Sequence, residues 1–323
     1  MGKLACIFPG QGSQAVGMGL SLFNQYPEAR RTFEEIDQIA GHKLSDLCFC
    51  GPESELKRTI NTQPTILAAS VAAWTCYQSQ GGPPPDFVAG HSLGEITALV
   101  AANALRLEDA VVLVKERAIL MEECPKGAMS AVLGLSLPKL AESCQQASSA
   151  LQGEGVSPDE AIVVVANFNT RDQLVISGHP IAVERASQLA KEAGAKVIAL
   201  PVGGAFHSPL MTSAAEKFNV TLGQVAIETP SVPIVQNFDA RPSVDGDEIK
   251  GKLREQMANC VRWCASIEYL LAQGVDTFVE IGPGKVLVGT VKKIDRTAKL
   301  FNVFDAETLQ ATMAGLKQAV TSA

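Results

Sequence analysis

The chain has 323 residues, enough for one large domain with an insertion or for two modest domains. Hydrophobic residues make up 46% of it and charged residues 19%, proportions that exclude a disordered or fibrous chain. The formal charge of −7 excludes a global basic field for nucleic acid, so an anionic partner would need a local basic patch.

The N-terminal segment is predicted to begin with a short apolar strand, Leu4 to Phe8, that ends at Pro9-Gly10. This run is too short for the apolar part of a signal peptide, and no cleavage site follows it. No run elsewhere approaches the roughly 18 apolar residues of a membrane span. We therefore expect a cytoplasmic protein that does not use a membrane.

Strand and helix patterns alternate along most of the chain. The predicted strands are Leu4 to Phe8, Asp86 to Ala89, Val232 to Val235, Thr277 to Ile281 and Leu300 to Phe304. The predicted helices are Pro27 to Ile39, Thr62 to Gln78, Gly94 to Leu105, Leu107 to Glu123, Ser266 to Gln273 and Ala306 to Val320. This alternation indicates an α/β fold with a parallel sheet.

The middle of the chain has a different order of elements. Residues 128–201 are predicted to contain strand, helix, strand, strand, helix and strand. This βαββαβ order is typical of a ferredoxin-like unit. We expect it to form a small subdomain inserted into a large one made of residues 1–127 and 202–323, with the chemistry in the cleft between them.

Eight cysteines raise the question of disulfides or a bound metal. There is no CxxC pair, and the histidines do not stand at ligand spacing from the cysteines. We expect reduced, mostly buried thiols that pack as small hydrophobic groups, and no metal. His42, Cys48 and Cys50 are the one group that suggests a metal, and their spacing does not favour it.

The segment Gly90-His91-Ser92-Leu93-Gly94 matches the G-x-S-x-G pattern of a nucleophile elbow. An apolar strand precedes it and a strong helix pattern follows, which is the setting that such a tight turn requires. The turn would place Ser92 at a helix N-terminus, where backbone N–H groups favour a developing negative charge. The alternative is an ordinary serine that caps the helix.

A nucleophilic serine needs a base, and in elbow enzymes the histidine follows the serine in the chain. Two histidines do so, His179 and His207. His179 lies between Gly178 and Pro180 and is expected to be a solvated turn residue. His207 lies in a loop where the chain leaves the inserted unit, a common position for catalytic groups, and it is the preferred candidate.

Arg117 lies on an apolar helix stripe with Ala110, Val114 and Met121. A guanidinium on such a face must be paired or must serve a ligand, because an unpaired buried charge is very costly. The helix pattern alone leaves two alternatives open. Arg117 either pairs with a glutamate elsewhere in the chain or binds an anionic group of a substrate.

Three segments carry a resemblance to a known family. Phe8 to Gln14, Gly90 to Glu95 and Ala205 to Pro209 resemble the signatures of malonyl-CoA:acyl-carrier-protein transacylases, which include discrete fatty-acid-synthesis enzymes and acyltransferase domains of polyketide synthases. Further segments agree in order along nearly the whole chain: Thr62 to Pro64, Gly127 to Met129, Val132 to Gly134, Val175 to Gly178 and Glu280 to Lys285. Cys260 departs from the pattern, because many members carry proline there.

The resemblance implies an α/β-hydrolase-like large subdomain with a ferredoxin-like insertion, and a ping-pong transfer of malonyl from CoA to acyl carrier protein. Ser92 would be the nucleophile and His207 the general base. The backbone N–H groups of Gln11 and Leu93 would form the oxyanion hole. The backbone carbonyl of Gln256 would orient the histidine, which gives a Ser–His dyad.

The resemblance also implies residues that select the substrate. Arg117 would bind the free malonyl carboxylate with two hydrogen bonds, a geometry that lysine does not reproduce. Gln63 would contact the substrate, and Phe206 would exclude a methyl-branched acyl group. No cofactor is implied, and a monomer is expected. Lys196, Lys292 and Lys293 are candidates for docking the acidic carrier protein.

Four alternatives remain beside fatty-acid synthesis by a Ser–His dyad. The carrier could belong to polyketide synthesis, served by a trans-acting acyltransferase. A serine thioesterase or esterase shares the elbow but has no use for Arg117, and a non-catalytic binding module has no use for Ser92 and His207. Asp239 or Asp245 could complete a triad, although both lie in a turn-like stretch.

Overall fold

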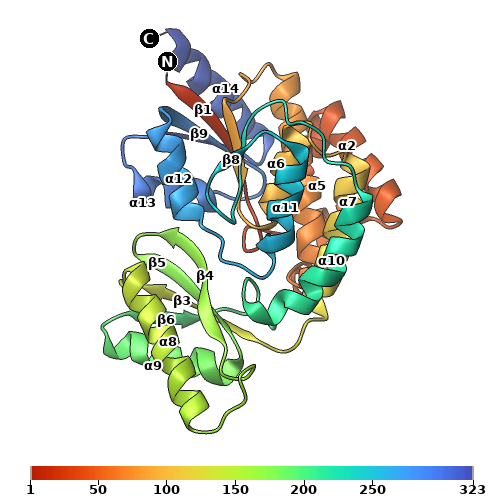
Figure 1. The fold of residues 1–323 in the computed structure, drawn as a ribbon. Coiled ribbons are helices and arrows are strands. Elements are labelled where there is room, and N and C mark those ends of the chain that lie inside the picture. The colour runs from red at the N-terminus through yellow and green to blue at the C-terminus, as the bar shows by residue number, and fades with distance from the viewer. Residues whose placement is uncertain (1, 322–323) are drawn as a thin grey trace.

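The computed structural model describes residues 2–321, of which residues 319–321 by their backbone alone. Its strands form a six-stranded sheet and a separate four-stranded sheet. In Figure 1 the four-stranded sheet lies below the larger one, in the yellow and green part of the chain. The predicted α/β fold with a second, smaller sheet is confirmed.

The large sheet takes strands from both ends of the chain, in the order β10-β9-β1-β2-β7-β8. These strands are β1 (Lys3–Phe8), β2 (Phe87–Gly90), β7 (Ile234–Val235), β8 (Pro242–Ser243), β9 (Val275–Ile281) and β10 (Lys299–Val303). Neighbours are parallel as predicted, except that β8 pairs with β7 in the antiparallel direction. Pro242 has no N–H to donate, which suits an edge strand. The predicted parallel sheet thus carries one antiparallel strand at this edge.

Helices cover both faces of the large sheet. They are α1 (Leu20–Gln25), α2 (Pro27–Ala40), α3 (Leu44–Cys50), α4 (Glu53–Leu56), α5 (Thr59–Ser79), α6 (Leu93–Ala101), α7 (Leu107–Glu122), η1 (Pro209–Met211), α10 (Thr212–Gln224), α11 (Gly246–Gln256), α12 (Trp263–Ala272), α13 (Val286–Ile294) and α14 (Ala306–Thr321). Within residues 2–321, none of the helices is long and apolar enough to cross a membrane.

Strand β1 is buried on both faces, and its side chains alternate between two apolar clusters. Cys6 and Phe8 join the larger cluster, which helices α2, α5, α6 and α7 cover, whereas Ala5 and Ile7 join a smaller one beneath α12 and α13 (Figure 1). Burial on both faces explains why the strand is a continuous apolar run without polar alternation. The carboxyl ends of β1 and β2 open into the loops that carry Gln11 and Ser92.

The small sheet is antiparallel and has the order β4-β5-β3-β6. Its elements are β3 (Ala128–Leu133), α8 (Leu137–Gly153), β4 (Val163–Thr170), β5 (Gln173–Gly178), α9 (Pro180–Glu192) and β6 (Lys196–Ala199). Helices α8 and α9 contribute Leu140 and Ala186 to an apolar cluster with Val132 and Ile176 from the strands. The βαββαβ order is therefore present as predicted.

Edge strand β4 connects the two sheets. Its pairing with β5 shifts between Val165 and Asn167, so the strand is irregular at this point. Here its outer edge bonds to the loop after α11: the N–H of Phe168 donates to Val261 O at 2.9 Å, and the N–H of Val261 donates to Ala166 O at 2.9 Å. This backbone link holds one end of β4 against the large part of the structure.

Candidate active site

The segment between β2 and α6 forms a tight turn with Ser92 at its tip. Ser92 has backbone angles of φ 52° and ψ −106°, values that serine rarely adopts and that the surrounding structure must enforce. It stands at the N-cap position of α6, yet its side chain makes no capping hydrogen bond. The alternative of an ordinary capping serine is therefore wrong, and the hydroxyl can meet other side chains.

Glycines make this turn possible because backbone passes very close to backbone on both sides of Ser92. A side chain at Gly90 would overlap the backbone of Gly94, and a side chain at Gly94 would overlap the carbonyl of Phe8 in β1. Neither neighbour can move without displacing a helix or a strand. The glycines are thus required by the packing of the elbow onto the sheet.

Replacing Gly94 with alanine should lower the free energy of unfolding by about 3 kcal/mol, because the added methyl group meets rigid backbone. Gly289→Ala in α13 is the matched control: nothing lies near the added carbon there, and alanine favours a helix by about 0.5–1 kcal/mol. Urea unfolding followed by circular dichroism measures both changes. Equal midpoints for Gly94→Ala and the wild type would contradict this packing.

His207 stands beside the serine with the orientation that a base requires. Its Nε2 lies 2.8 Å from Ser92 Oγ, and its Nδ1 lies 2.9 Å from the carbonyl oxygen of Gln256. A carbonyl only accepts, so Nδ1 carries the hydrogen and Nε2 presents a lone pair to the hydroxyl. The two candidate acids are used elsewhere, because Asp239 pairs with a lysine and Asp245 caps α11.

The surroundings of His207 keep its ring uncharged. The side chain is buried, and this burial, followed by the positive charge of Arg117, lowers its pKa to about 3. Its hydrogen bond with the Gln256 carbonyl acts in the opposite direction and does not offset the loss of solvent. The imidazole is therefore available as a proton acceptor at neutral pH.

Arg117 is buried at 2% exposure and reaches the same serine. One nitrogen of its guanidinium donates to Gln63 Oε1 at 2.6 Å, and the other donates to Ser92 Oγ at 2.9 Å and to Gln256 Oε1 at 3.0 Å. None of the ion pairs within residues 2–321 includes it, so no glutamate forms a salt bridge with it. Burial lowers its pKa to about 10, although the charge of the buried Glu95 acts to raise it, and the guanidinium stays charged at neutral pH.

Two glutamines hold the guanidinium in place. Gln63 Nε2 points to the sulfur of Met121 at 3.1 Å, which leaves its oxygen for Arg117. Gln256 Nε2 donates to the backbone oxygen of Ser92 at 3.0 Å, so its side chain joins the arginine to the elbow. The sequence singled out Gln256 only for its backbone carbonyl, and the structure gives its side chain a second contact with the site.

The backbone N–H groups of Gln11 and Leu93 lie at the same cavity as Ser92. Leu93 is the first residue of α6, so its N–H has no partner within the helix. No hydrogen bond among the described residues uses the N–H of Gln11. The N–H of Ser92 itself is taken, because it donates to Asn237 Oδ1 at 2.7 Å. The N–H groups of Gln11 and Leu93 thus have no partner among the described residues, and their role as oxyanion donors stays a prediction.

These groups line a cavity of about 180 Å³ between the two sheets. Its walls come from the large part of the chain and from the small sheet: Gln11, Gln63, His91, Ser92, Leu93, Arg117, Met121, Met129, Asn167, Asn169, Val175, Leu200, Val202, Phe206 and His207. His91 Nε2 lies 2.8 Å from Asn169 Oδ1, which joins the elbow to β4. All the residues proposed for catalysis and substrate contact except Gln256 line this one space.

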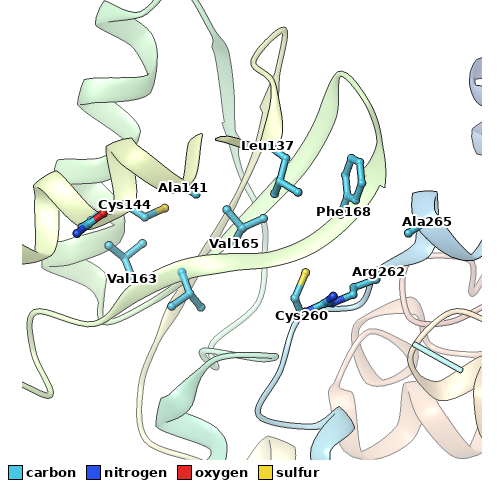
Figure 2. Close-up of a pocket in the computed structure, with 11 residues that line it drawn as sticks. Leu137, Ala141, Cys144, Val163, Val165, Phe168, Cys260, Arg262 and Ala265 are labelled. Atoms are coloured by element: carbon cyan, nitrogen blue, oxygen red, sulfur yellow. The ribbon is translucent and has the colours of Figure 1, made fainter. Parts of the chain in front are cut away.

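A larger cavity of about 540 Å³ lies between α8, β4 and residues 260–265 (Figure 2). Its walls are mostly apolar, with Arg262 as the charged residue: Leu137, Ala141, Cys144, Gln145, Val163, Val164, Val165, Phe168, Cys260, Arg262 and Ala265. It contains no group that contacts Ser92 or His207. Cavity size therefore does not mark the chemistry here; the hydrogen bonds around Ser92 do.

The other histidines and cysteines singled out by the sequence lie away from Ser92. His179 stands at the N-cap of α9 and is only partly exposed, and its Nδ1 has no hydrogen-bond partner among the described residues, so it is less solvated than expected. His42 is exposed, Cys48 is buried, and Cys50 is exposed. Within residues 2–321, no three His, Cys, Asp or Glu side chains are grouped so as to hold a metal.

The three lysines suggested for docking are exposed but do not form one cluster along the chain. Lys196 begins β6, and Lys292 and Lys293 lie in the last turn of α13, where positive charge also suits the helix dipole. Lys293 Nζ donates to Gln173 Oε1 at 3.0 Å, a contact between α13 and β5. Their role in docking stays a prediction.

Comparison with known proteins gives the family. Residues 5–319 match the model of the acyl transferase domain. The chain is 46% identical to the malonyl CoA-acyl carrier protein transacylase of Bacillus subtilis, with 98% of each chain covered. It superposes with a TM-score of 0.90 on an acyl carrier protein S-malonyltransferase from Vibrio cholerae, at 40% identity and with 96% and 99% of the two chains covered.

A further solved structure shows such an enzyme with its partner. It is a malonyl-transacylase in complex with a type II polyketide synthase acyl-carrier protein, with a TM-score of 0.91, 39% identity, and coverage of 97% of this chain and 99% of that one. The resemblance predicted from the three sequence signatures is confirmed. The chain belongs to the acyl transferase family, among the malonyl CoA-acyl carrier protein transacylases.

Proposed function

We propose that this protein transfers the malonyl group from malonyl-CoA to the phosphopantetheine thiol of acyl carrier protein, through an ester on Ser92, and so supplies extender units for fatty-acid synthesis. One observation carries the proposal: the buried Arg117 guanidinium donates to the hydroxyl of Ser92 at 2.9 Å. A cation in that position suits an acyl group that carries its own carboxylate. Water-using hydrolases of neutral acyl groups have no use for it.

In the first half-reaction, Ser92 Oγ attacks the thioester carbon while its proton passes to Nε2 of His207. The carbonyl electrons move to oxygen, and the resulting oxyanion receives hydrogen bonds from the N–H groups of Gln11 and Leu93. The C–S bond then breaks, and the imidazolium returns the proton to the CoA thiolate. The products are the malonyl ester of Ser92 and free CoA.

The second half-reaction repeats these steps in reverse with a different thiol. The phosphopantetheine S–H gives its proton to His207, the sulfur attacks the ester carbon, and the same two N–H groups bind the oxyanion. The C–O bond breaks, and the proton returns to Ser92 Oγ. Proton, acyl group and leaving groups balance, and the scheme uses no cofactor.

The acyl group would be selected by Arg117 with help from Gln63 and Phe206. Two parallel N–H donors match a carboxylate, and Gln63 fixes the direction in which the guanidinium faces. The ring of Phe206 is buried in the cavity wall, where it limits the room for a branch on the acyl chain. An acetyl group would leave the arginine without an anionic partner.

We also propose how the chain is divided around this site: residues 128–201 form the small subdomain, and residues 1–127 and 202–323 form the large one. The acidic carrier protein would dock at exposed lysines, with Lys196, Lys292 and Lys293 as candidates. A monomer in the cytoplasm remains the expectation from the sequence. A polyketide carrier is the second candidate partner, because a relative at 39% identity is solved with one.

The test is whether malonyl-CoA labels Ser92. Intact-mass spectrometry after a brief incubation should show one malonyl adduct on the wild type and none on Ser92→Ala. Ser70→Ala is the matched control, since this buried serine has no hydrogen-bond partner within residues 2–321 and its loss should leave the adduct unchanged. An adduct that persists in Ser92→Ala would sink the mechanism. Transfer to fatty-acid or polyketide carrier protein then distinguishes the two partners.

A further inference from the structure

The strained backbone of Ser92 is held by side chains that are distant in the sequence. Its N–H donates to Asn237 Oδ1 at 2.7 Å, and its carbonyl accepts from Gln256 Nε2 at 3.0 Å. Asn237 Nδ2 also donates to the carbonyl of Gly90 at 2.7 Å. One amide side chain therefore bridges both ends of the turn that presents the nucleophile.

Asn237 is in turn fixed by a buried carboxylate. Its backbone N–H donates to Glu95 Oε2 at 2.7 Å, and Gln236 Nε2 lies 3.3 Å from Glu95 Oε1. Glu95, Gln236 and Asn237 are all at most 1% exposed. None of them lines the cavity around Ser92, so they lie behind the elbow and contact it from there.

The position of Glu95 departs from the usual use of glutamate at a helix start. It is the third residue of α6, where a glutamate commonly reaches back to the N–H of the capping residue. Here that N–H, on Ser92, is bound by Asn237 instead, and Glu95 binds Asn237. Asn237 is thus inserted between Glu95 and the N–H of Ser92. This arrangement accommodates the positive φ of Ser92, which a direct capping box does not produce.

We propose that Glu95 and Asn237 are positioning residues that hold Ser92 in its strained turn, so that its hydroxyl meets His207 and faces the N–H groups of Gln11 and Leu93. Without them the backbone can relax toward an ordinary conformation, which moves Oγ away from the base. The inference deepens the proposed function and rests on it for the malonyl substrate. Burial raises the pKa of Glu95 to about 7, and its oxygen can accept from Asn237 whether or not it is protonated.

The experiment compares Asn237→Ala, Glu95→Ala and Glu95→Gln with the wild type. The first readout is the single-turnover rate of Ser92 acylation at several malonyl-CoA concentrations. The second is the rate of phosphorylation by diisopropyl fluorophosphate, which forms a Ser92 phosphate ester with release of fluoride, uses Ser92 and His207, and needs no carboxylate partner. Thr97→Val is the matched control, because this buried hydroxyl of α6 has no hydrogen-bond partner in the part of the chain that the structure describes.

Both alanine variants should lower the maximal acylation rate about 100-fold, because a shift of the nucleophile by about 1 Å has an effect of that order. In Asn237→Ala the malonyl-CoA concentration at half-maximal rate should change less than about threefold, since Asn237 contacts neither Arg117 nor Gln63. Glu95 also interacts with the charge of Arg117, so Glu95→Ala is judged by the reaction that needs no carboxylate partner. Glu95→Gln should keep most of the rate, because its amide oxygen can still accept from Asn237. The double alanine variant should be no slower than either single one, as expected for residues acting in series.

The proposal is overturned if the folded alanine variants are acylated at the wild-type rate. It is also overturned if Asn237→Ala raises the half-maximal malonyl-CoA concentration while the maximal acylation rate stays the same, or if the loss of rate only follows the fraction of unfolded protein. Should Asn237→Ala not fold, Asn237→Asp keeps an acceptor for Ser92 but not the donor to Gly90, and should slow both reactions. A wild type that is phosphorylated by the fluorophosphate but takes no malonyl would refute the substrate, while the rate of phosphorylation would still decide the positioning role.

Discussion

Arg117→Ala should remove the preference of the enzyme for malonyl over acetyl groups. A buried site built for a carboxylate should reject the analogue that lacks it by about 10⁴-fold in the wild type. Removing the guanidinium should lower acylation by malonyl-CoA about 10⁴-fold, because the carboxylate then enters a buried site with no cation. Acylation by acetyl-CoA should change far less, so the ratio of the two rates should approach one. Quenched-flow mass spectrometry with each thioester measures both rates.

Arg117→Lys tests the geometry separately from the charge. An ammonium group cannot donate to Gln63, Ser92 and Gln256 from fixed directions as the guanidinium does. We expect this variant to recover only about one tenth of the lost malonyl rate. Arg106→Ala, an exposed arginine at the start of the same helix, is the control and should behave as wild type. Equal malonyl and acetyl rates in the wild type would contradict the proposed role of Arg117.

Much of the site could be predicted because its signals are local. The elbow could be predicted from the glycines on either side of Ser92, which only a tight turn requires. The burial of Arg117 could be predicted from the apolar residues one helical turn before and after it. Chain order and its loop position made His207 the preferred base, and the family resemblance added the role, because a loop histidine far along the chain carries no local sign of its partner. In the structure, His207 Nε2 and the Arg117 guanidinium both lie within hydrogen-bond distance of Ser92 Oγ.

Helix α11 was not predicted, because periodicity cannot be seen where few apolar residues occur. Its residues are largely polar, and only Ile249 and Leu253 provide an apolar face. Helices α1, α3 and α4 have at most seven residues, too few for a period of 3.6 to repeat clearly. Tertiary contacts rather than local pattern stabilise these segments.

Asn237 and Glu95 were also missed, although a signal for Asn237 exists. Gln236 and Asn237 directly follow strand β7, and polar residues after parallel strands gather at one edge of the sheet. The same rule places Gln11 after β1 and Ser92 after β2. Glu95 offers no such signal, because a glutamate in the first turn of a helix is ordinary and its burial depends on the packing of β7 behind it.

His207→Ala should lower the acylation rate about 10⁴-fold, because Ser92 then has no group to take its proton. Arg117 cannot replace the base, since it stays charged at neutral pH and only donates to the hydroxyl. Gln256 would keep its side-chain contact with the Ser92 backbone, so the turn itself should remain. His42→Ala, which removes an exposed histidine, is the control and should leave the rate unchanged.

The pH dependence of the wild type tests the low pKa of this base. A histidine with the usual pKa of about 6.5 would be mostly protonated at pH 5, and the acylation rate would fall about 30-fold from its value at pH 8. Burial and the Arg117 charge lower the pKa of His207 to about 3, so the uncharged base persists and the rate should stay nearly constant over this range. Glu95 titrates near pH 7, and Glu95→Gln shows whether its charge contributes. A tenfold fall per pH unit below 6.5 in both proteins would mean that His207 is far more solvated than its burial indicates.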